Sequence, residues 1–309
     1  MCRGAIGSIS LLLATQAPVW PSRELRDGHI GQVEGVAFSP DGRWLASADN
    51  SGSVIVRSLP GFDAVATLRG ANFTELAWTN DGAMLVAGGF DSLAYVWQSP
   101  FTQPARTLRY PGPVEAVAIT PDGVLLAAGG GERSIRRWRL VSGEELPPLR
   151  GHTDDIYAVR VHPNGRLIAS GGRDRTIRIW DPSTRRPPRI LRGHGDSVYD
   201  LAFSSEGALL ISGCRDGTVG VWSTQSWTLQ RLLRGPSNSV HGVAVSPNSR
   251  WLAGADFDNR VWIWQLADTT SAQTLMGHRR KVSGVAFSPD GQWLASAASD
   301  TTVRIWTVP

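Results

Sequence analysis

The chain repeats itself about every 42 residues. An apolar triplet of the type Val36-Ala37-Phe38 occurs seven times, and successive copies start 40 to 42 residues apart. A tryptophan series runs in phase with it, from Trp97 to Trp306 in steps of 41 or 42 residues. Self-similarity at a fixed period is the signature of a repeat architecture, so these two markers predict seven copies of one structural unit.

Each unit has the pattern of short strands joined by turns. The Ser-Pro-Asp-Gly of residues 39–42 suits a type I turn, because Pro fixes φ and Gly closes the corner. Apolar and polar residues alternate over residues 176–180, which is typical of a strand with two unlike faces. We expect four short strands in each unit, which leaves no room for helices.

Four units open with the pair Gly-His, and one tryptophan is followed by aspartate, at Trp180-Asp181. The Gly-His pairs are Gly28-His29, Gly151-His152, Gly193-His194 and Gly277-His278. On these motifs and the repeat length, residues 18–309 resemble the WD40 family. The resemblance implies an all-β fold, a seven-bladed β-propeller whose blades are four-stranded antiparallel sheets.

The last unit contains only three strands, because it stops at Trp306. One strand's worth of sequence, residues 19–26, precedes the first Gly-His pair. We therefore expect this N-terminal strand to complete the C-terminal blade and close the ring. The predicted domains are a tail over residues 1–17 and a single propeller over residues 18–309.

The tail allows two interpretations. We expect an unstructured tail or the ragged end of a longer protein, and hence a cytoplasmic location. Arg3, the leucines at 11–13 and the small residues that follow loosely match a signal peptide, which would place the protein in the periplasm or outside the cell.

Composition excludes several other classes of protein. A hydrophobic fraction of 41% argues against disorder, and two distant cysteines, Cys2 and Cys214, argue against a disulfide scaffold. No apolar run is long enough to span a membrane as a helix. The net charge of +4 comes from scattered arginines, so we do not expect nucleic-acid binding. Arginine-rich usage with one lysine, Lys281, points to a bacterial source.

Histidine, serine, aspartate and tryptophan recur together at fixed spacing in units four, five and seven. These sets are His152, Ser170, Asp174 and Trp180; His194, Ser212, Asp216 and Trp222; and His278, Ser296, Asp300 and Trp306. A Ser-His-Asp trio suggests a hydrolase triad, but three copies indicate a structural role. The resemblance implies that the Asp accepts from the His and that the Ser bonds the Trp N–H.

The remaining units lack part of this set. Unit one has His29, Ser47, Ser51 and Arg57 in the four slots, and units two, three and six have no histidine there. We expect these blades to depend more on apolar packing.

No motif predicts catalysis, a cofactor or a metal site. His241 is the one histidine outside the signature and the turns, and a metal needs several converging ligands. The glycines at 129–131 precede no helix, so they do not predict a phosphate-binding loop. Cys214 lies among small residues and is expected to be buried and inert.

The resemblance also places two positions of each unit on the top of the ring: the start of the first strand and the residue before the turn aspartate. In units four to six these are Tyr157, Arg173, Tyr199, Arg215, His241 and Phe257. Tyrosine and arginine are enriched at binding hot spots, so we predict a protein-binding patch here. The alternative is that these are ordinary solvated turn residues.

The sequence thus predicts a monomeric, non-catalytic scaffold that binds one or more proteins and needs no cofactor. Two alternatives stay open. One is a propeller enzyme or small-molecule sensor that uses the central channel, and the other is the repeat module of a larger regulatory protein.

Overall fold

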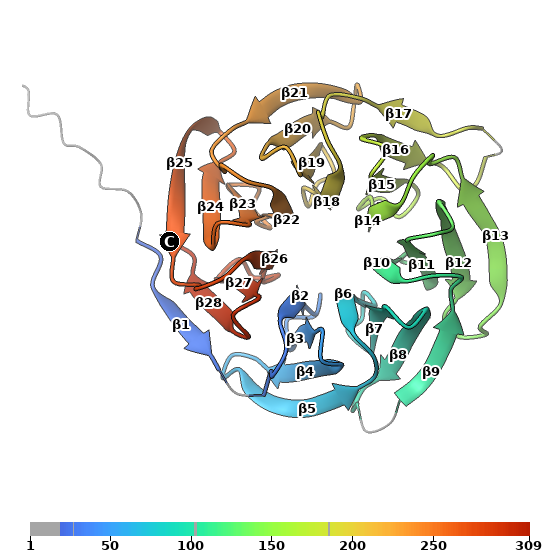
Figure 1. The fold of residues 1–309 in the computed structure, drawn as a ribbon, viewed down its shortest axis with the longest axis horizontal. Coiled ribbons are helices and arrows are strands. Elements are labelled where there is room, and N and C mark those ends of the chain that lie inside the picture. Colours follow the sequence, from blue (N-terminus) through green and yellow to red (C-terminus); the bar gives the residue numbers. More distant parts are fainter. Residues whose placement is uncertain (1–18, 27, 102–103, 185) are drawn as a thin grey trace, which may run out of the picture.

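The computed structural model describes residues 19–26, 28–101, 104–184 and 186–309. These residues form seven four-stranded antiparallel sheets, arranged as blades around a central axis (Figure 1). The prediction of an all-β, seven-bladed propeller is confirmed. The tail, residues 1–17, lies outside the described residues. Within the described residues, no helix is long and apolar enough to cross a membrane.

Six blades take their four strands consecutively from the chain, with the first strand innermost and the fourth outermost (Figure 1). Blade one contains β2 (Val33–Phe38), β3 (Trp44–Asp49), β4 (Ser53–Ser58) and β5 (Asp63–Arg69). Blade two contains β6 (Phe73–Trp78), β7 (Met84–Gly89), β8 (Leu93–Gln98) and β9 (Pro104–Arg109). Blade three contains β10 (Val114–Ile119), β11 (Val124–Gly129), β12 (Ser134–Arg139) and β13 (Glu145–Arg150). Blade four contains β14 (Ile156–Val161), β15 (Ile168–Gly172), β16 (Ile177–Trp180) and β17 (Arg189–Leu191). Blade five contains β18 (Val198–Phe203), β19 (Leu209–Cys214), β20 (Val219–Ser223) and β21 (Thr228–Leu233). Blade six contains β22 (Val240–Val245), β23 (Trp251–Asp256), β24 (Arg260–Gln265) and β25 (Asp268–Met276).

Blade seven combines the two ends of the described chain. Its inner strands are β26 (Val282–Phe287), β27 (Trp293–Ala298) and β28 (Val303–Thr307), and its outer strand is β1 (Ser22–Leu25). β1 pairs antiparallel with β28. The predicted ring closure by an N-terminal strand is therefore confirmed.

Side-chain contacts within blade seven and with blade six reinforce this closure. Trp20 is buried and packs edge-to-face on Trp251 of blade six, with ring centroids 5.5 Å apart. Arg304 of β28 donates to Glu24 of β1 at 2.6 Å. The N-terminal strand is thus held by an apolar anchor and an ion pair as well as by backbone bonds.

The hydrophobic core lies between blades. Each of the seven core clusters among the described residues combines side chains from two neighbouring blades. In one of them, Val54 of blade one packs with Phe73 and Trp97 of blade two. A single blade cannot cover its own two faces, so the ring is the smallest unit that buries them all.

Antiparallel strands define two faces of the ring. The turns after the first and third strands of each blade lie at one end of its sheet, which we call the bottom face. The turn after the second strand and the connection to the next blade lie at the other end, the top face. This geometry brings short loops from every blade to the rim of the central channel.

Candidate functional site

The His-Ser-Asp-Trp set of blade four forms one continuous hydrogen-bonded chain. His152 Nδ1 lies 2.8 Å from Asp174 Oδ2, and His152 Nε2 lies 2.7 Å from Ser170 Oγ. Trp180 Nε1 donates to Ser170 Oγ at 2.8 Å. A carboxylate only accepts and an indole N–H only donates. His152 Nδ1 therefore donates to Asp174, and the Ser170 hydroxyl donates to His152 Nε2.

Blade seven has the same series of hydrogen bonds, but the contacts of the histidine Nδ1 atom are longer. His278 lies 2.7 Å from Ser296, and Trp306 donates to Ser296 at 2.9 Å. The Nδ1 atom of His278 lies 3.2 Å from both Asp300 and Thr302, so its proton is shared between two acceptors.

Blade five departs from the expected pattern. His194 bonds Ser212 at 2.6 Å, and Trp222 donates to Ser212 at 2.8 Å, but no hydrogen bond joins His194 to Asp216. Instead His194 Nδ1 lies 3.2 Å from the hydroxyl of Thr218. That hydroxyl donates to Asp216 at 2.5 Å, so the threonine relays the interaction.

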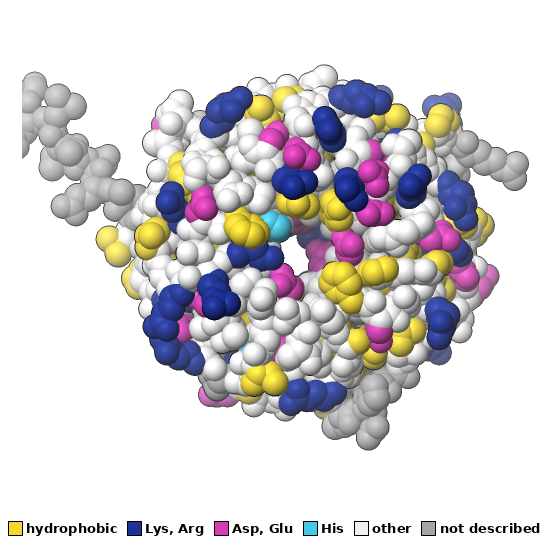
Figure 2. Space-filling view, viewed as in Figure 1, with side chains coloured by type: hydrophobic (Ala, Val, Ile, Leu, Met, Phe, Trp, Pro, Cys, Tyr) yellow, Lys and Arg dark blue, Asp and Glu magenta, His cyan; other side chains and the backbone are white. Residues whose placement is uncertain are grey.

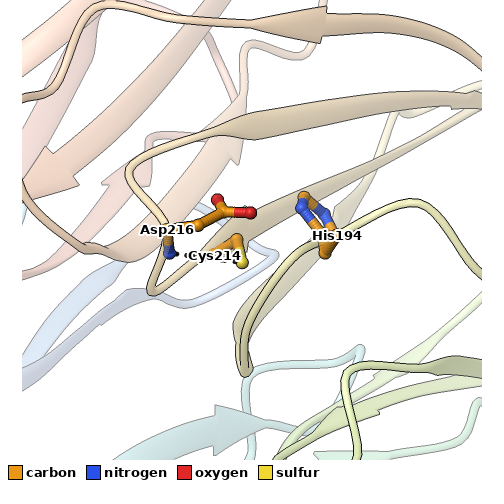
Figure 3. A group of neighbouring side chains, drawn as sticks. All are labelled: His194, Cys214 and Asp216. Carbon is orange, nitrogen blue, oxygen red and sulfur yellow. Dashed lines mark hydrogen bonds between the residues drawn. The ribbon is translucent and has the colours of Figure 1, made fainter.

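Cys214 lies beside these residues (Figure 3). One ligand atom from each of His194, Cys214 and Asp216 lies within 4.8 Å of the other two, close enough to share a metal ion. Each group is already satisfied without one: the thiol donates to the Asp196 carbonyl and accepts from Asp216 N. Burial raises the pKa of Cys214 to about 12, which keeps it a thiol. The trio is therefore a hydrogen-bonded part of the blade.

Blade one is more complete than its sequence indicated. His29 Nδ1 lies 2.7 Å from Asp49 Oδ2, and His29 Nε2 lies 2.7 Å from Ser47 Oγ. Asp49 stands two residues before the turn position where the carboxylate was expected, now Ser51. We expected this blade to depend more on apolar packing, but it contains a histidine network of its own.

Blade six uses the same alternative position. Asp256 is fully buried and accepts from Trp262 Nε1 at 2.7 Å, although the blade has no signature histidine. The signal for Asp49 and Asp256 is an aspartate at the end of the second strand, where the other units have glycine, alanine or cysteine.

Hydrogen bonds stabilise the ionised form of these buried carboxylates. Burial alone would raise the pKa of Asp49, but hydrogen bonds from His29, Ser51 and Ser53 outweigh it and lower the pKa to about 2. The pKa of Asp174 is also well below its usual value, because hydrogen bonds from His152 and Thr176 outweigh the effect of burial.

The networks are closed to substrates. Ser170 is fully buried, and its oxygen already contacts both His152 and Trp180. A serine nucleophile must reach the carbonyl carbon of its substrate, which this packing prevents. The geometry supports a structural role for the repeated trio.

Four of the predicted top-face residues form a continuous series of rings, which we call the aromatic arc: Tyr157, Tyr199, His241 and Phe257. The ring centroids of Tyr157 and Tyr199 are 5.3 Å apart. Those of Tyr199 and His241 are 4.6 Å apart and nearly parallel, and His241 and Phe257 follow at 5.6 Å. Burial and the charge of Lys281 lower the pKa of His241 to about 4, so this imidazole is neutral at pH 7.

The two predicted arginines lie on the turns outside this arc. Arg173 is 59% exposed, with its guanidinium 3.8 Å from Asp154 and 4.0 Å from Asp155. Arg215 is exposed and lies close enough to Tyr199 to oppose the rise in that residue's pKa, which burial causes. The structure thus brings all six predicted residues together on neighbouring blades.

The central channel is lined by the innermost strand of every blade and encloses about 980 Å³. An ionic cross-brace, made of Glu75, Arg160 and Asp200, spans part of it. Arg160 Nη2 of blade four lies 2.5 Å from Glu75 Oε1 of blade two and 2.5 Å from Asp200 Oδ1 of blade five. The two carboxylates also accept from Val117 N and Val243 N, so the cross-brace connects blades two to six.

The cross-brace was not predicted, although the sequence contains a signal for it. Arg160 stands in the middle of a repeated triplet whose other six copies have alanine there. An arginine in that apolar, inward-facing position needs a partner, but the repeat alone does not show which blade supplies it.

The fold and its repeated hydrogen-bonded sets define a WD-repeat propeller, and comparison with known families agrees. The family described as "WD domain, G-beta repeat" matches residues 21–58, 62–98, 102–139, 143–181, 185–223, 227–265 and 269–307. The chain belongs to this WD40 family, whose members are generally non-catalytic modules that act with protein partners.

Individual relatives match over part of their length. The chain is 31% identical over 118 residues to the 66 kDa stress protein of Physarum polycephalum, covering 37% of this chain and 20% of that protein. It is 32% identical over 127 residues to Protein FIZZY-RELATED 1 of Arabidopsis thaliana, and this match covers 39% of this chain and 26% of that protein. It is 33% identical over 132 residues to Anaphase-promoting complex subunit cdc20 of Dictyostelium discoideum, also covering 39% and 26%. These organisms are eukaryotes, so the relatives do not support the expected bacterial source.

Proposed function

We propose that this propeller is a non-catalytic scaffold whose top face binds a partner protein. The observation that carries the proposal is the juxtaposition of the aromatic arc with Arg173 and Arg215 on short loops. Binding residues tend to occupy loops held by a rigid framework. Large aromatic rings and arginines are the side chains that contribute most at protein interfaces.

The top face also exposes large apolar side chains, and their exposure to water does not stabilise the fold. Phe257 is 48% exposed at the end of the arc, and Phe90 of blade two is equally exposed at the matching turn. One relative is named as a subunit of a complex, which supports a protein partner for this propeller. A monomeric, cytoplasmic protein that binds no nucleic acid remains our expectation.

The cross-brace disfavours the alternative of a small-molecule site or active site deep in the channel. Arg160 is held between two carboxylates, and these carboxylates are bonded to backbone amides. A ligand or substrate at this depth would have to displace those partners. The mouth of the channel is open, as Figure 2 shows.

The test is affinity capture with the whole chain as bait, followed by mass spectrometry. We expect Arg173→Ala with Tyr199→Ala to fold normally and to lose the principal partner. A matched pair on the bottom face, Arg139→Ala with Val141→Ala, removes one arginine and one exposed apolar side chain and should retain it. Equal capture by both double variants would contradict a top-face site.

A further inference from the structure

The channel carries more negative than positive side chains. Among the described residues that line it, the charged ones are the carboxylates Glu34, Glu75, Glu115 and Asp200 and the cations Arg160 and Lys281. Arg160 is shared by Glu75 and Asp200, as described above. Lys281 lies 3.3 Å from Glu34. Both cations are therefore engaged, and the acidic excess falls on Glu115.

Glu115 has no hydrogen bond or ion pair among the described residues, although it is half-buried at the start of β10. Burial raises the pKa of Glu115 to about 7, and the nearby charge of Asp155 adds to the rise. A carboxylate in this position is destabilised for want of a cation. The fold supplies none from its own described side chains.

The loop next to Glu115 leaves space for one. A side-chain carbon built on Gly130 would lie 3.7 Å from Glu115 Oε1, so the carboxylate borders a residue without a side chain. At the turn position where blades four and five carry Arg173 and Arg215, blade three has Gly131, and a side-chain carbon there would meet nothing within 4 Å. Gly130 and Gly131 thus leave space beside an unpaired carboxylate.

The aromatic arc begins beside this space. Tyr157, its first ring, lines the channel together with Glu115, and the charge of Glu115 adds to the larger effect of burial in raising the pKa of the phenol. Aromatic faces attract cations, and a carboxylate attracts them more strongly. The mouth therefore combines two features that favour one positively charged side chain and disfavour phosphates.

We propose that the top-face site recognises a partner segment that inserts a lysine or arginine side chain between Glu115 and Tyr157. This inference rests on the proposed scaffold function and specifies the chemistry of the partner. The rest of the segment lies along the aromatic arc, and Arg173 and Arg215 face any acidic residues that flank its cation. The inserted charge completes the pairing that the channel lacks.

The experiment is a selection of random displayed peptides on the immobilised whole propeller. Peptides that bind the wild type are synthesised and measured by fluorescence anisotropy against Glu115→Gln and Tyr199→Ala. The matched control is Glu144→Gln, which removes a carboxylate paired with Arg139 at the bottom face. A second series of peptides replaces each lysine or arginine with norleucine, which keeps the aliphatic stem and removes the charge.

We expect the selected peptides to share a lysine or arginine whose replacement weakens binding roughly tenfold, as does Glu115→Gln, because one charge-assisted contact is lost. Glu144→Gln should leave affinity unchanged. Peptides that need Tyr199 but neither Glu115 nor a cation would overturn this inference and leave the scaffold proposal standing. A selection that yields no binder dependent on Tyr199 would contradict both.

Discussion

The histidine at the top of a blade can be held by a carboxylate from either of two positions. In blade four the carboxylate is Asp174, in the turn after the second strand, and in blade one it is Asp49, at the end of that strand. Both place an oxygen 2.7–2.8 Å from the same imidazole nitrogen. The network is therefore defined by the hydrogen bond, and the sequence position of the acid can vary.

Replacing Asp174 with alanine should destabilise the fold. The change removes the acceptor of His152 and of the Thr176 hydroxyl, and a buried unsatisfied group costs roughly 1–3 kcal/mol. Urea unfolding monitored by tryptophan fluorescence measures the loss. Asp63→Ala, at an exposed position in β5, is the control and should change the free energy of unfolding little. Equal stability of the two variants would contradict this role for Asp174.

The lowered pKa of Asp49 predicts how stability depends on pH. Its folded value of about 2 lies below the usual 3.8, so the ionised form stabilises the native state. That contribution is complete above pH 4 or so and is lost as the pH falls toward 2. Asp49→Asn should cost about 2 kcal/mol at pH 7. The difference in free energy of unfolding between this variant and the wild type should shrink between about pH 4 and pH 2. Urea unfolding at each pH measures it.

Side-chain contacts are easier to anticipate from the sequence where the chemistry repeats than where it is used once. The spacing of His152, Ser170 and Trp180 recurs in other units, so the sequence alone indicated their shared role. Asp49 substitutes for a missing acid within one blade, and its partner becomes visible only when the second strand is placed beside His29. Arg160 is harder still, because its partner Glu75 belongs to a blade that is not its neighbour.

At the scale of the strand, β1 has the greatest influence for its length. It contributes four residues to blade seven, yet it covers the edge of β28 and brings Trp20 against blade six. Its position was predictable because the final repeat lacked a strand and the N-terminal segment had nothing else to pair with. The aromatic anchor before it was not, because Trp20 belongs to no repeated series.

Deleting residues 1–26 should lower the melting temperature and cause self-association, because β28 becomes an exposed edge. Deleting residues 1–17 alone should change little. Size-exclusion chromatography and thermal unfolding of both truncations provide the measurement. A monomer that melts at the wild-type temperature after the longer deletion would refute the closing role of β1.

Trp20→Ala separates the anchor from the strand itself. It leaves the pairing of β1 with β28 in place and removes a buried ring, at a cost of roughly 3–5 kcal/mol if the cavity does not collapse. Val19→Ala, at a neighbouring position that is 75% exposed, is the matched control. In thermal unfolding, the wild type and V19A should have similar melting temperatures, and that of W20A should be well below both.

Across the whole molecule, the cross-brace links blade four to blade two, which is not its neighbour in the ring. Repeat proteins are stabilised mainly by contacts between successive units. Here Arg160 adds a connection from blade four to blade two, across the channel. Arg160→Ala should cost roughly 3 kcal/mol or less, because it leaves two carboxylates close together without their shared cation.

Removing the stranded charges should reverse much of that loss. The triple variant with Arg160→Ala, Glu75→Gln and Asp200→Asn should unfold at higher urea concentration than Arg160→Ala alone. If the triple variant is no more stable than the single one, charge pairing is not what Arg160 contributes. The core between the blades is the same in both variants, so the comparison isolates the cross-brace.

The composition of blade seven also governs when the molecule can finish folding. Glu24 and Arg304, which pair across its outer strands, are 280 residues apart. At a synthesis rate of about 5–20 residues per second, β1 waits roughly 15 to 60 seconds on the ribosome before β28 is made. During that time blades one to six can form only an open arc, with Trp20 and the free sides of the first and last blades uncovered. Nascent chains are therefore most exposed to chaperones and to one another in the interval just before the last strand emerges.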